Sequence, residues 1–170
     1  MEIYLRVVHK DGGKSLDAAH LLPAWCKQQM RSDVPQLVAY VDGSSHGNPG
    51  PSGIGVIVED AAGGRTRIGK WIGWQDNNVA EYVALMEALQ CALERKAESI
   101  CVYSDSDVVV RQMSGEYDCR SARLYPLHWI CRKLARSLEF AIKRIPREHN
   151  TEANDLANTA ARLCQNFTEI

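Results

Sequence analysis

Short apolar runs bounded by turn residues predict five β-strands from residue 36 onward. The strands cover residues 37–41, 54–58, 67–72, 100–103 and 140–145. A Gly-Asn-Pro-Gly-Pro cluster at 47–51 and the Gly63-Gly64 pair separate the first three. Closely spaced strands with turn residues between them are typical of an antiparallel meander.

Helical spacing of apolar residues predicts four helices between and after these strands. The clearest covers residues 77–95, where Leu85, Ala88 and Leu89 share one face and Asn77 or Asn78 could cap the start. The others cover residues 106–114, about 121–137, and 151–165. The order β-β-β-α-β-α-α-β-α predicts an α/β fold, in which a mixed sheet begins as a meander, continues with parallel strands and is flanked by helices.

The length of 170 residues suits one domain with a sizeable core. We interpret residues 36–166 as that domain and residues 167–170 as a tail. Residues 1–35 would form an extension of unknown role, with a short strand at 2–9 and a helix at 16–30.

Composition and charge narrow the class of protein. The formal net charge is -1, so a nucleic-acid site would have to be a local basic patch. The 6 cysteines show no C-x-x-C spacing, which favours reduced thiols over a disulfide or zinc framework. No run approaches the ~20 apolar residues of a membrane span, and the N-terminus lacks a signal-peptide pattern. We therefore expect a monomeric cytoplasmic protein without a membrane partner.

Three carboxylates are candidates for chemistry because of where they fall on the predicted elements. Asp42 and Asp105 each follow an apolar strand, at the edge where open α/β sheets bind ligands. Glu81 shares the apolar face of the 77–95 helix, where an unpaired charge is costly. Singly, they could serve a turn, a helix cap and a helix dipole. Together they could bind Mg²⁺, and two such ions about 4 Å apart suit attack on a phosphodiester.

Four segments, in order, resemble the motifs of the type 1 ribonuclease H family. They are residues 40–51, 77–82, 103–117 and 146–158. The first reads Tyr-Val-Asp-Gly-Ser-Ser-His-Gly-Asn-Pro-Gly-Pro and the second Asn-Asn-Val-Ala-Glu-Tyr. The third begins Tyr-Ser-Asp-Ser, and the fourth contains Ala-Asn-Asp-Leu-Ala-Asn. The match covers about residues 36–166, and the short, weakly basic stretch from Tyr117 to Trp129 resembles the compact form that lacks a basic protrusion.

The resemblance implies a ribonuclease H-like fold and hydrolysis of the RNA strand of RNA–DNA hybrids by two-metal-ion catalysis. Asp42, Glu81 and Asp105 would bind two Mg²⁺ ions, or Mn²⁺ in their place, with Asp42 bridging both. One ion would activate the attacking water and the other would stabilise the leaving 3′ oxygen.

The resemblance also implies a set of substrate-binding residues. They are Gly43, Ser44, Asn48, Asn77, Asn78 and Ser106. Asparagine suits the minor groove because its amide both donates and accepts hydrogen bonds at base edges and 2′-hydroxyls. His149 falls in the loop that carries the family's mobile catalytic histidine, although a solvated loop residue is an equal interpretation.

Asn154 stands where the family has its fourth catalytic and metal-binding carboxylate. Asp155 follows it, about 100° further round a helix. An amide oxygen can still coordinate a metal but carries no charge, so weaker metal binding is expected. Three explanations stay open: a natural variant with residual activity, an inactivating change that traps substrate, or a local distortion that brings Asp155 into the site.

Asp76 is a second departure, because the family usually has threonine before the paired asparagines. Aspartate there would repel a DNA phosphate, or it would be a solvent-facing charge at the helix start. Basic residues cluster after the third motif, either as a solvated helix face or as contacts to DNA phosphates. They are Arg111, Arg120, Arg123, Arg132, Lys133 and Arg136.

Two other functions stay open. A degenerate domain could hold hybrids without cutting them, which Asn154 and Asp76 would suit. Another nuclease or strand-transfer enzyme of the same fold could act on DNA. The asparagine pair at 77–78 and the glycine-rich first motif favour the hybrid as substrate.

Overall fold

The computed structural model describes residues 35–170, so the strand and helix expected within residues 1–34 lie outside the described part. The strands of residues 35–170 are β1 (Leu37–Ser45), β2 (Gly50–Asp60), β3 (Arg65–Gln75), β4 (Ser99–Ser104), β5 (Glu139–Arg144) and β6 (Phe167–Glu169). The helices are α2 (Asn77–Glu94), α3 (Asp107–Ser114), α4 (Tyr125–Ala135) and α5 (Thr151–Leu163), with a short 3₁₀ turn, η2 (Arg147–His149), before α5.

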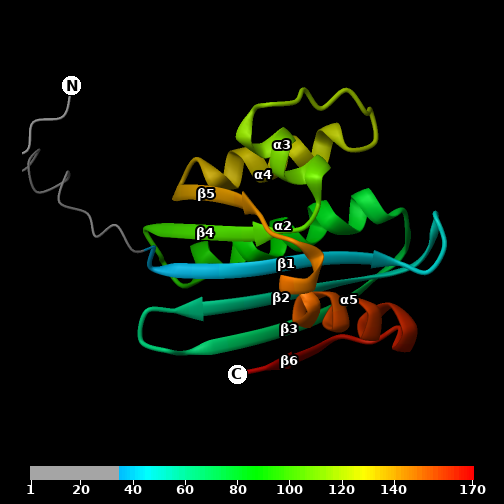
Figure 1. Ribbon diagram of the computed structural model, residues 1–170, viewed down its shortest axis with the longest axis horizontal. Coiled ribbons are helices and arrows are strands. Elements are labelled where there is room, and N and C mark those ends of the chain that lie inside the picture. Colours follow the sequence, from blue (N-terminus) through cyan, green and yellow to red (C-terminus); the bar gives the residue numbers. More distant parts are fainter. Residues whose placement is uncertain (1–34) are drawn as a thin grey trace, which may run out of the picture. The chain divides into compact units, whose positions relative to one another are not determined.

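The strands form one mixed sheet in the order β5-β4-β1-β2-β3-β6 (Figure 1). β1, β2 and β3 pair antiparallel, because short turns join them, and form the predicted meander. β4 pairs parallel with β1 and with β5. Parallel neighbours need long crossovers, and here helices provide them: α2 before β4, and α3 with α4 before β5. The predicted α/β fold is confirmed.

The side chains of the sheet pack into two hydrophobic cores, one on each face, because successive residues of a strand point to opposite faces. Leu37, Ala39 and Val41 of β1 belong to the larger core, which also contains side chains of α2, α3 and α4. Tyr40 and Ile57 pack on the other face against α5. The sheet therefore lies between α2 on one side and α5 on the other (Figure 1).

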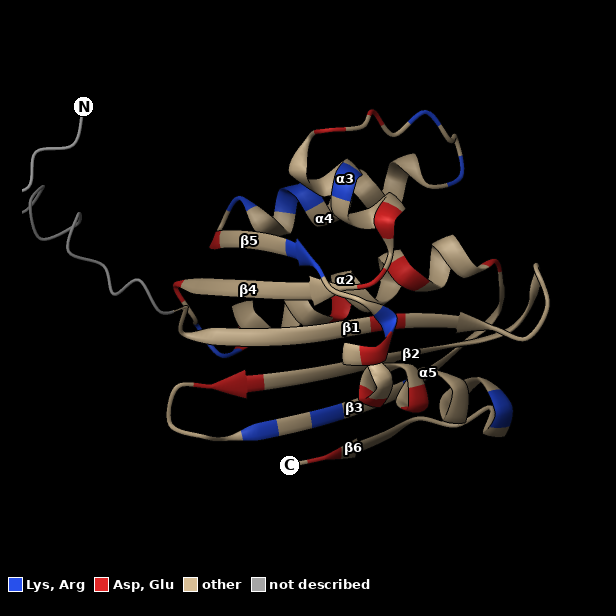
Figure 2. Ribbon diagram, in the orientation of Figure 1, with Lys and Arg blue, Asp and Glu red and all other residues tan. Residues whose placement is uncertain are grey.

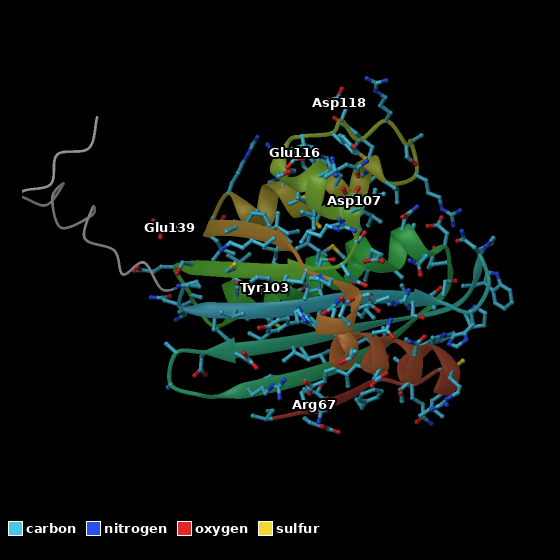
Figure 3. All side chains as sticks on the ribbon, viewed as in Figure 1. Arg67, Tyr103, Asp107, Glu116, Asp118 and Glu139 are labelled. Atoms are coloured by element: carbon cyan, nitrogen blue, oxygen red, sulfur yellow. The ribbon has the colours of Figure 1, made fainter. Side chains whose placement is uncertain are left out.

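The sheet has six strands in the described part, not the predicted five. The expected tail, residues 167–170, contains β6, which pairs antiparallel with β3. Arg67 of β3 also forms an ion pair with Glu169 at 3.0 Å (Figure 3). A strand of three residues carries too little alternation for a sequence pattern to mark it.

The first three strands extend beyond the apolar runs that predicted them. β1 continues past Val41 because the following residues keep pairing with β2 as far as Ser45 opposite Ser52. β2 and β3 likewise begin and end among polar residues. Backbone hydrogen bonds to a partner strand, which leave no apolar signature, hold these ends.

Asp76 caps helix α2, and the predicted caps Asn77 and Asn78 are the first residues of the helix itself. The Asp76 carboxylate accepts a hydrogen bond from the Val79 N–H at 2.9 Å. An N-cap aspartate satisfies one of the free amides at a helix start, which explains the residue without reference to a ligand. Its other oxygen forms an ion pair with Arg123 at 3.1 Å.

Ser106 caps helix α3 by accepting a hydrogen bond from the Val109 N–H at 3.4 Å. Asp105 therefore does not serve as the cap of this helix. Helix α4 begins at Tyr125, later than the predicted start near residue 121.

The cysteines of the described part are free, as expected for reduced thiols. They are Cys91, Cys101, Cys119, Cys131 and Cys164. Among residues 35–170, no helix combines the length and apolar character needed to cross a bilayer.

Helix α5 lies directly on β2 because two glycines leave room for its backbone. A Cβ atom on Gly55 would collide with the Ala153 carbonyl oxygen and lie 2.8 Å from the Ala157 amide nitrogen. A Cβ on Gly53 would lie 2.5 Å from the Ala161 amide nitrogen. This contact fixes the height and the rotation of the helix that carries the fourth motif.

Gly55→Ala should therefore lower the free energy of unfolding by about 3 kcal/mol, because backbone atoms cannot move aside as a flexible side chain would. Gly115→Ala is the matched control: its φ of 84° is strained for alanine, but nothing lies within 4 Å of the added atom. That control should lose only about 1 kcal/mol. Urea unfolding measures both, and equal losses would contradict the close contact between α5 and β2.

Candidate active site

The register of the sheet brings Asp42 and Asp105 together. Val41 of β1 pairs with Ser104, the last residue of β4, so an aspartate follows on each strand. The sequence analysis placed Asp42 at the end of its strand, but it lies inside β1, which continues to Ser45, and it is 3% exposed. Asp105 is half-buried just after β4. Both carboxylates lie where the parallel pairing of β1 and β4 stops.

Glu81 reaches the same place from helix α2, and it is 8% exposed on the core-facing stripe as predicted. A Cβ on Gly43 would collide with the backbone of Glu81, so glycine lets α2 approach β1. The Asn77 amide donates to Glu81 Oε1 at 3.2 Å. Asn48 Oδ1 accepts from the Asn77 backbone N–H at 3.1 Å, which joins the β1–β2 turn to the start of α2.

Burial and repulsion by neighbouring carboxylates disfavour the charged forms of Asp42 and Glu81. Burial first, and then the charge of Asp105, raises the pKa of Asp42 from its ordinary value of 3.8 to about 7. Burial also raises the pKa of Glu81 well above its ordinary value, and the charges of Asp42 and Asp105 raise it further. We call Asp42, Glu81 and Asp105 the acidic cluster.

Asn154 lies beside the acidic cluster, as its place in the fourth motif predicts. Its Nδ2 donates to Asp42 Oδ2 at 2.9 Å. Asn158, one turn later on α5, donates from Nδ2 to Asn154 Oδ1 at 2.9 Å. Asp155 is exposed and lines a surface hollow with His46 and Arg162, so the distortion that would bring it into the site does not occur.

Asn150 is a site residue that the sequence analysis missed. It is 2% exposed and donates from Nδ2 to Asp105 Oδ1 at 2.8 Å and to the Val41 carbonyl at 2.9 Å. The only sequence signal was its position four residues before Asn154, at the N-cap of α5, which places both side chains on one side of the helix.

The donor set of the acidic cluster fits a hard divalent cation. Glu81 Oε2 is buried without a hydrogen-bond partner, and carboxylate oxygens are ligands that Mg²⁺ prefers. A cation would also offset the repulsion within the cluster. Within residues 35–170, no group of three or more His, Cys, Asp or Glu side chains is already arranged around a metal position. The three carboxylates and the unpaired Glu81 oxygen are therefore the features of the cluster that suit a divalent cation.

Other predicted site residues lie around the cluster or away from it. Ser44 and Ser106 are half-buried, and Ser106 lowers the pKa of Glu81 against the larger effects of burial and charge. Asn78 is exposed at the start of α2. His149 is exposed and lines a hollow of about 210 Å³ with Arg65, beside β1 and β2.

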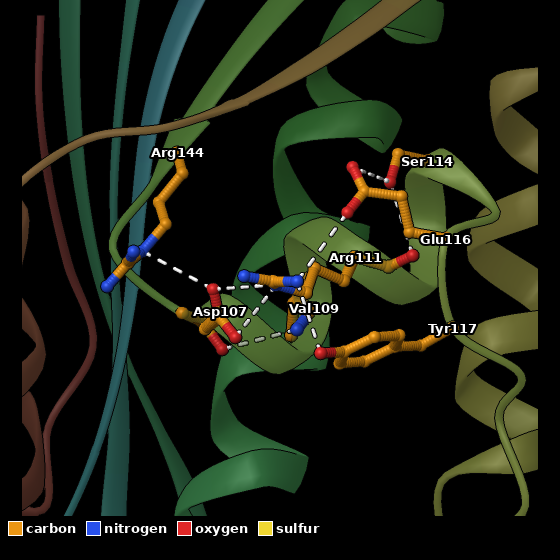
Figure 4. A network of polar contacts seen from close by, with 8 residues as sticks. Asp107, Val109, Arg111, Ser114, Glu116, Tyr117 and Arg144 are labelled. Atoms are coloured by element: carbon orange, nitrogen blue, oxygen red, sulfur yellow. Dashed lines mark hydrogen bonds and ion pairs between the residues drawn. The ribbon is translucent and has the colours of Figure 1, made fainter.

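The basic residues after the third motif divide into two groups. Arg111 pairs with Asp107 at 3.0 Å and with Glu116 at 3.8 Å, and Arg144 of β5 joins Asp107 at 3.6 Å (Figure 4). These pairs hold α3 and the turn after it. Figure 2 shows the second group on α4. Its exposed members are Arg132 and Lys133 on α4 and Arg136 directly after it.

The meander, the parallel pair β1–β4 and the acidic cluster at their junction define a protein of the ribonuclease H-like class. A family model described as "Reverse transcriptase-like" matches residues 40–160. The chain belongs to the type 1 ribonuclease H family, which confirms the predicted resemblance.

Two relatives show how much of the chain is shared. Ribonuclease HI of Halobacterium salinarum is 36% identical over 124 residues, which cover 72% of this chain and 62% of the relative. A bifunctional protein of Mycobacterium tuberculosis is 37% identical over 128 residues, which cover 74% of this chain and 35% of the relative. The chain thus spans less than two thirds of the length of either relative.

Solved structures agree with the fold. Ribonuclease H1 from Halobacterium salinarum superimposes with a TM-score of 0.71 at 34% identity, over 76% of this chain and 98% of that one. LC11-RNase H1, solved in complex with an RNA/DNA hybrid, gives a TM-score of 0.69 at 33% identity, over 75% and 98% of the two chains.

The metal-free protein should become less stable as the pH rises through the weakly acidic range. The pKa of Asp42 is about 7 in the folded protein against an ordinary 3.8, so the folded state binds more protons between these values. The free energy of unfolding should therefore fall from about pH 4 to about pH 7 as Asp42 loses its proton.

Asp42→Asn should reduce this dependence and raise stability above pH 7 by on the order of 3 kcal/mol, while Glu81, whose pKa is also raised, keeps its own part of the slope. Asp155→Asn, at an exposed site on α5, is the control. Denaturant unfolding in the presence of a chelator, repeated across this pH range, gives the slopes. If the free energy of unfolding of Asp42→Asn changed with pH as steeply as that of the starting protein, the claim that burial raises the pKa of Asp42 would be wrong.

Proposed function

We propose that this chain is an endoribonuclease that hydrolyses the RNA strand of RNA–DNA hybrids. The observation that carries the proposal is the acidic cluster, in which Asp42, Glu81 and Asp105 converge and one buried carboxylate oxygen of Glu81 has no partner. Membership of the type 1 ribonuclease H family supports it, as does the hybrid bound to a relative of similar structure.

The acidic cluster would hold two divalent cations through its carboxylate oxygens, with Mg²⁺ as the expected ion and Mn²⁺ able to replace it. Bound there, such ions activate an attacking water and stabilise the leaving 3′ oxygen. The protein's own part is to keep the carboxylates in place. Asn150 holds Asp105 and Asn154 holds Asp42 by amide hydrogen bonds. His149, exposed in η2, would assist proton or product transfer.

Recognition of the hybrid would fall to polar groups beside the cluster. Asn48, Asn77 and Asn78 lie at the β1–β2 turn and the start of α2, where their amides can pair with base edges and 2′-hydroxyls in the minor groove. Ser44 and Ser106 offer hydroxyls next to the carboxylates, and Gly43 lets the two elements meet. A 2′-hydroxyl distinguishes RNA from DNA, so this set would select the RNA strand.

Glu81→Gln should reduce cleavage of an end-labelled RNA–DNA hybrid by at least about 100-fold, because the charge that binds the cation is lost while shape is kept. Glu87→Gln, on the same helix but paired with Lys70 at 2.7 Å, is the matched control and should cleave normally. Circular dichroism checks that both variants fold. Full activity of Glu81→Gln would remove this residue from the metal site.

Asn154→Asp should raise the rate of hybrid cleavage in Mg²⁺ about tenfold, because it adds a negative charge next to Asp42 for cation binding. The assay compares both proteins on the hybrid and on matched RNA and DNA duplexes, in Mg²⁺ and then in Mn²⁺.

A second candidate function is hybrid binding without cleavage, and the neutral Asn154 beside Asp42 favours it. If the starting chain and Asn154→Asp both bind the hybrid and neither cuts it, hybrid binding replaces hydrolysis as the proposed function. Cleavage of the DNA duplex would instead indicate a DNA-directed enzyme of the same fold.

A further inference from the structure

Four side chains form a continuous line of hydrogen bonds that ends at Asp42. The Ser44 hydroxyl donates to Asn158 Oδ1 at 2.6 Å. Asn158 Nδ2 donates to Asn154 Oδ1 at 2.9 Å, and Asn154 Nδ2 donates to Asp42 Oδ2 at 2.9 Å. Asn158 Nδ2 also donates to the Asn154 backbone carbonyl at 3.0 Å. We call this line the asparagine relay.

Two groups that can only accept hydrogen bonds, the Asn154 backbone carbonyl and the Asp42 carboxylate, fix which way the amides of the relay point. A backbone carbonyl can only accept, so Asn158 must turn its NH₂ toward Asn154 and its oxygen toward Ser44. The Asn154 oxygen then accepts from Asn158, and the Asn154 NH₂ points at Asp42. An ionised carboxylate only accepts, so this orientation suits Asp42 as well.

We infer that Asn154 is a positioning residue, which donates a hydrogen bond to orient Asp42, and that Asn158 sets its orientation. For its effect on catalysis the inference rests on the proposed function. Turning the Asn154 oxygen toward the acidic cluster would bring two NH₂ groups face to face. Asn158 would then have to turn as well and would lose its side-chain bond to the Asn154 backbone carbonyl. Asn154 therefore does not take the place of the fourth metal ligand.

The first test is the amide orientation in the metal-free, substrate-free full chain. NMR resolves the side-chain NH₂ signals of Asn154 and Asn158. Asn158→Ala should shift the Asn154 signals and bring its two protons closer in chemical shift, while Thr159→Ala, the neighbouring residue on α5, leaves them in place. Unchanged Asn154 signals in Asn158→Ala would overturn the relay. If Asn158→Ala does not fold, Ser44→Ala should shift the Asn158 signals instead, and their constancy would have the same meaning.

The second test separates a donor from a ligand by titrating Mg²⁺ into the same proteins by calorimetry. If both residues act through Asp42, Asn154→Ala, Asn158→Ala and the double variant should bind Mg²⁺ within about twofold of one another. A metal-ligating Asn154 would instead make Asn154→Ala at least about tenfold weaker than Asn158→Ala, which would overturn the inference.

Kinetics supply the third test, which depends on cleavage. Asn154→Ala should lower kcat on the hybrid about tenfold while KM changes less than about twofold, because orientation of Asp42 affects the reaction and not the contacts with substrate. A change in KM alone would argue against positioning. If the starting chain cuts no hybrid, the proposed function fails, but the NMR and Mg²⁺ tests still decide the relay because neither contains substrate.

Discussion

Gathering three carboxyl groups at one edge of the sheet, two of them buried and one half-buried, is the constraint on which the rest of this domain depends. The pairing of Val41 with Ser104 and the contact of Gly43 with α2 bring together groups that repel one another. Burial first, and then that repulsion, raises the pKa values of Asp42 and Glu81. A counter-charge would stabilise like charges that are held together in a low-dielectric position. The oxygen of Glu81 that is buried without a hydrogen-bond partner is the clearest place for one.

Neutral amides moderate this repulsion without cancelling it. Asn150 and Asn154 each donate a hydrogen bond to one aspartate, and the bond from Asn154 lowers the pKa of Asp42 against burial and the charge of Asp105. An amide stabilises a carboxylate by hydrogen bonding alone, whereas another carboxylate would add repulsion in the free protein and attraction once a cation is bound. Asparagine at residue 154 thus favours the stability of the free protein over the affinity of the proposed cation site.

Local patterns in the sequence predicted what local physics determines. The apolar stripe of α2 placed Glu81 facing the core, and the motif spacing placed Asn154 beside Asp42. What the sequence could not show depends on distant partners: β1 runs past Val41 because β2 pairs with it, and β6 exists because β3 offers an edge. The contact of Asn150 with Asp105 spans 45 residues, and only the four-residue spacing to Asn154 hints at it in the sequence.

The rotation of α5 explains why Asp155 does not compensate for the missing charge at residue 154. Adjacent residues of a helix differ by about 100°, so Asp155 could enter the cluster only if the helix turned about its axis. Gly53 and Gly55 of β2 prevent this, because the α5 backbone lies against them with no space for even one added carbon atom. The same contact holds Asn158 beside Asn154. With α5 held in this rotation, the side chain of residue 154 is the one that contacts Asp42. An amide at that position stabilises the Asp42 carboxylate only by donating a hydrogen bond.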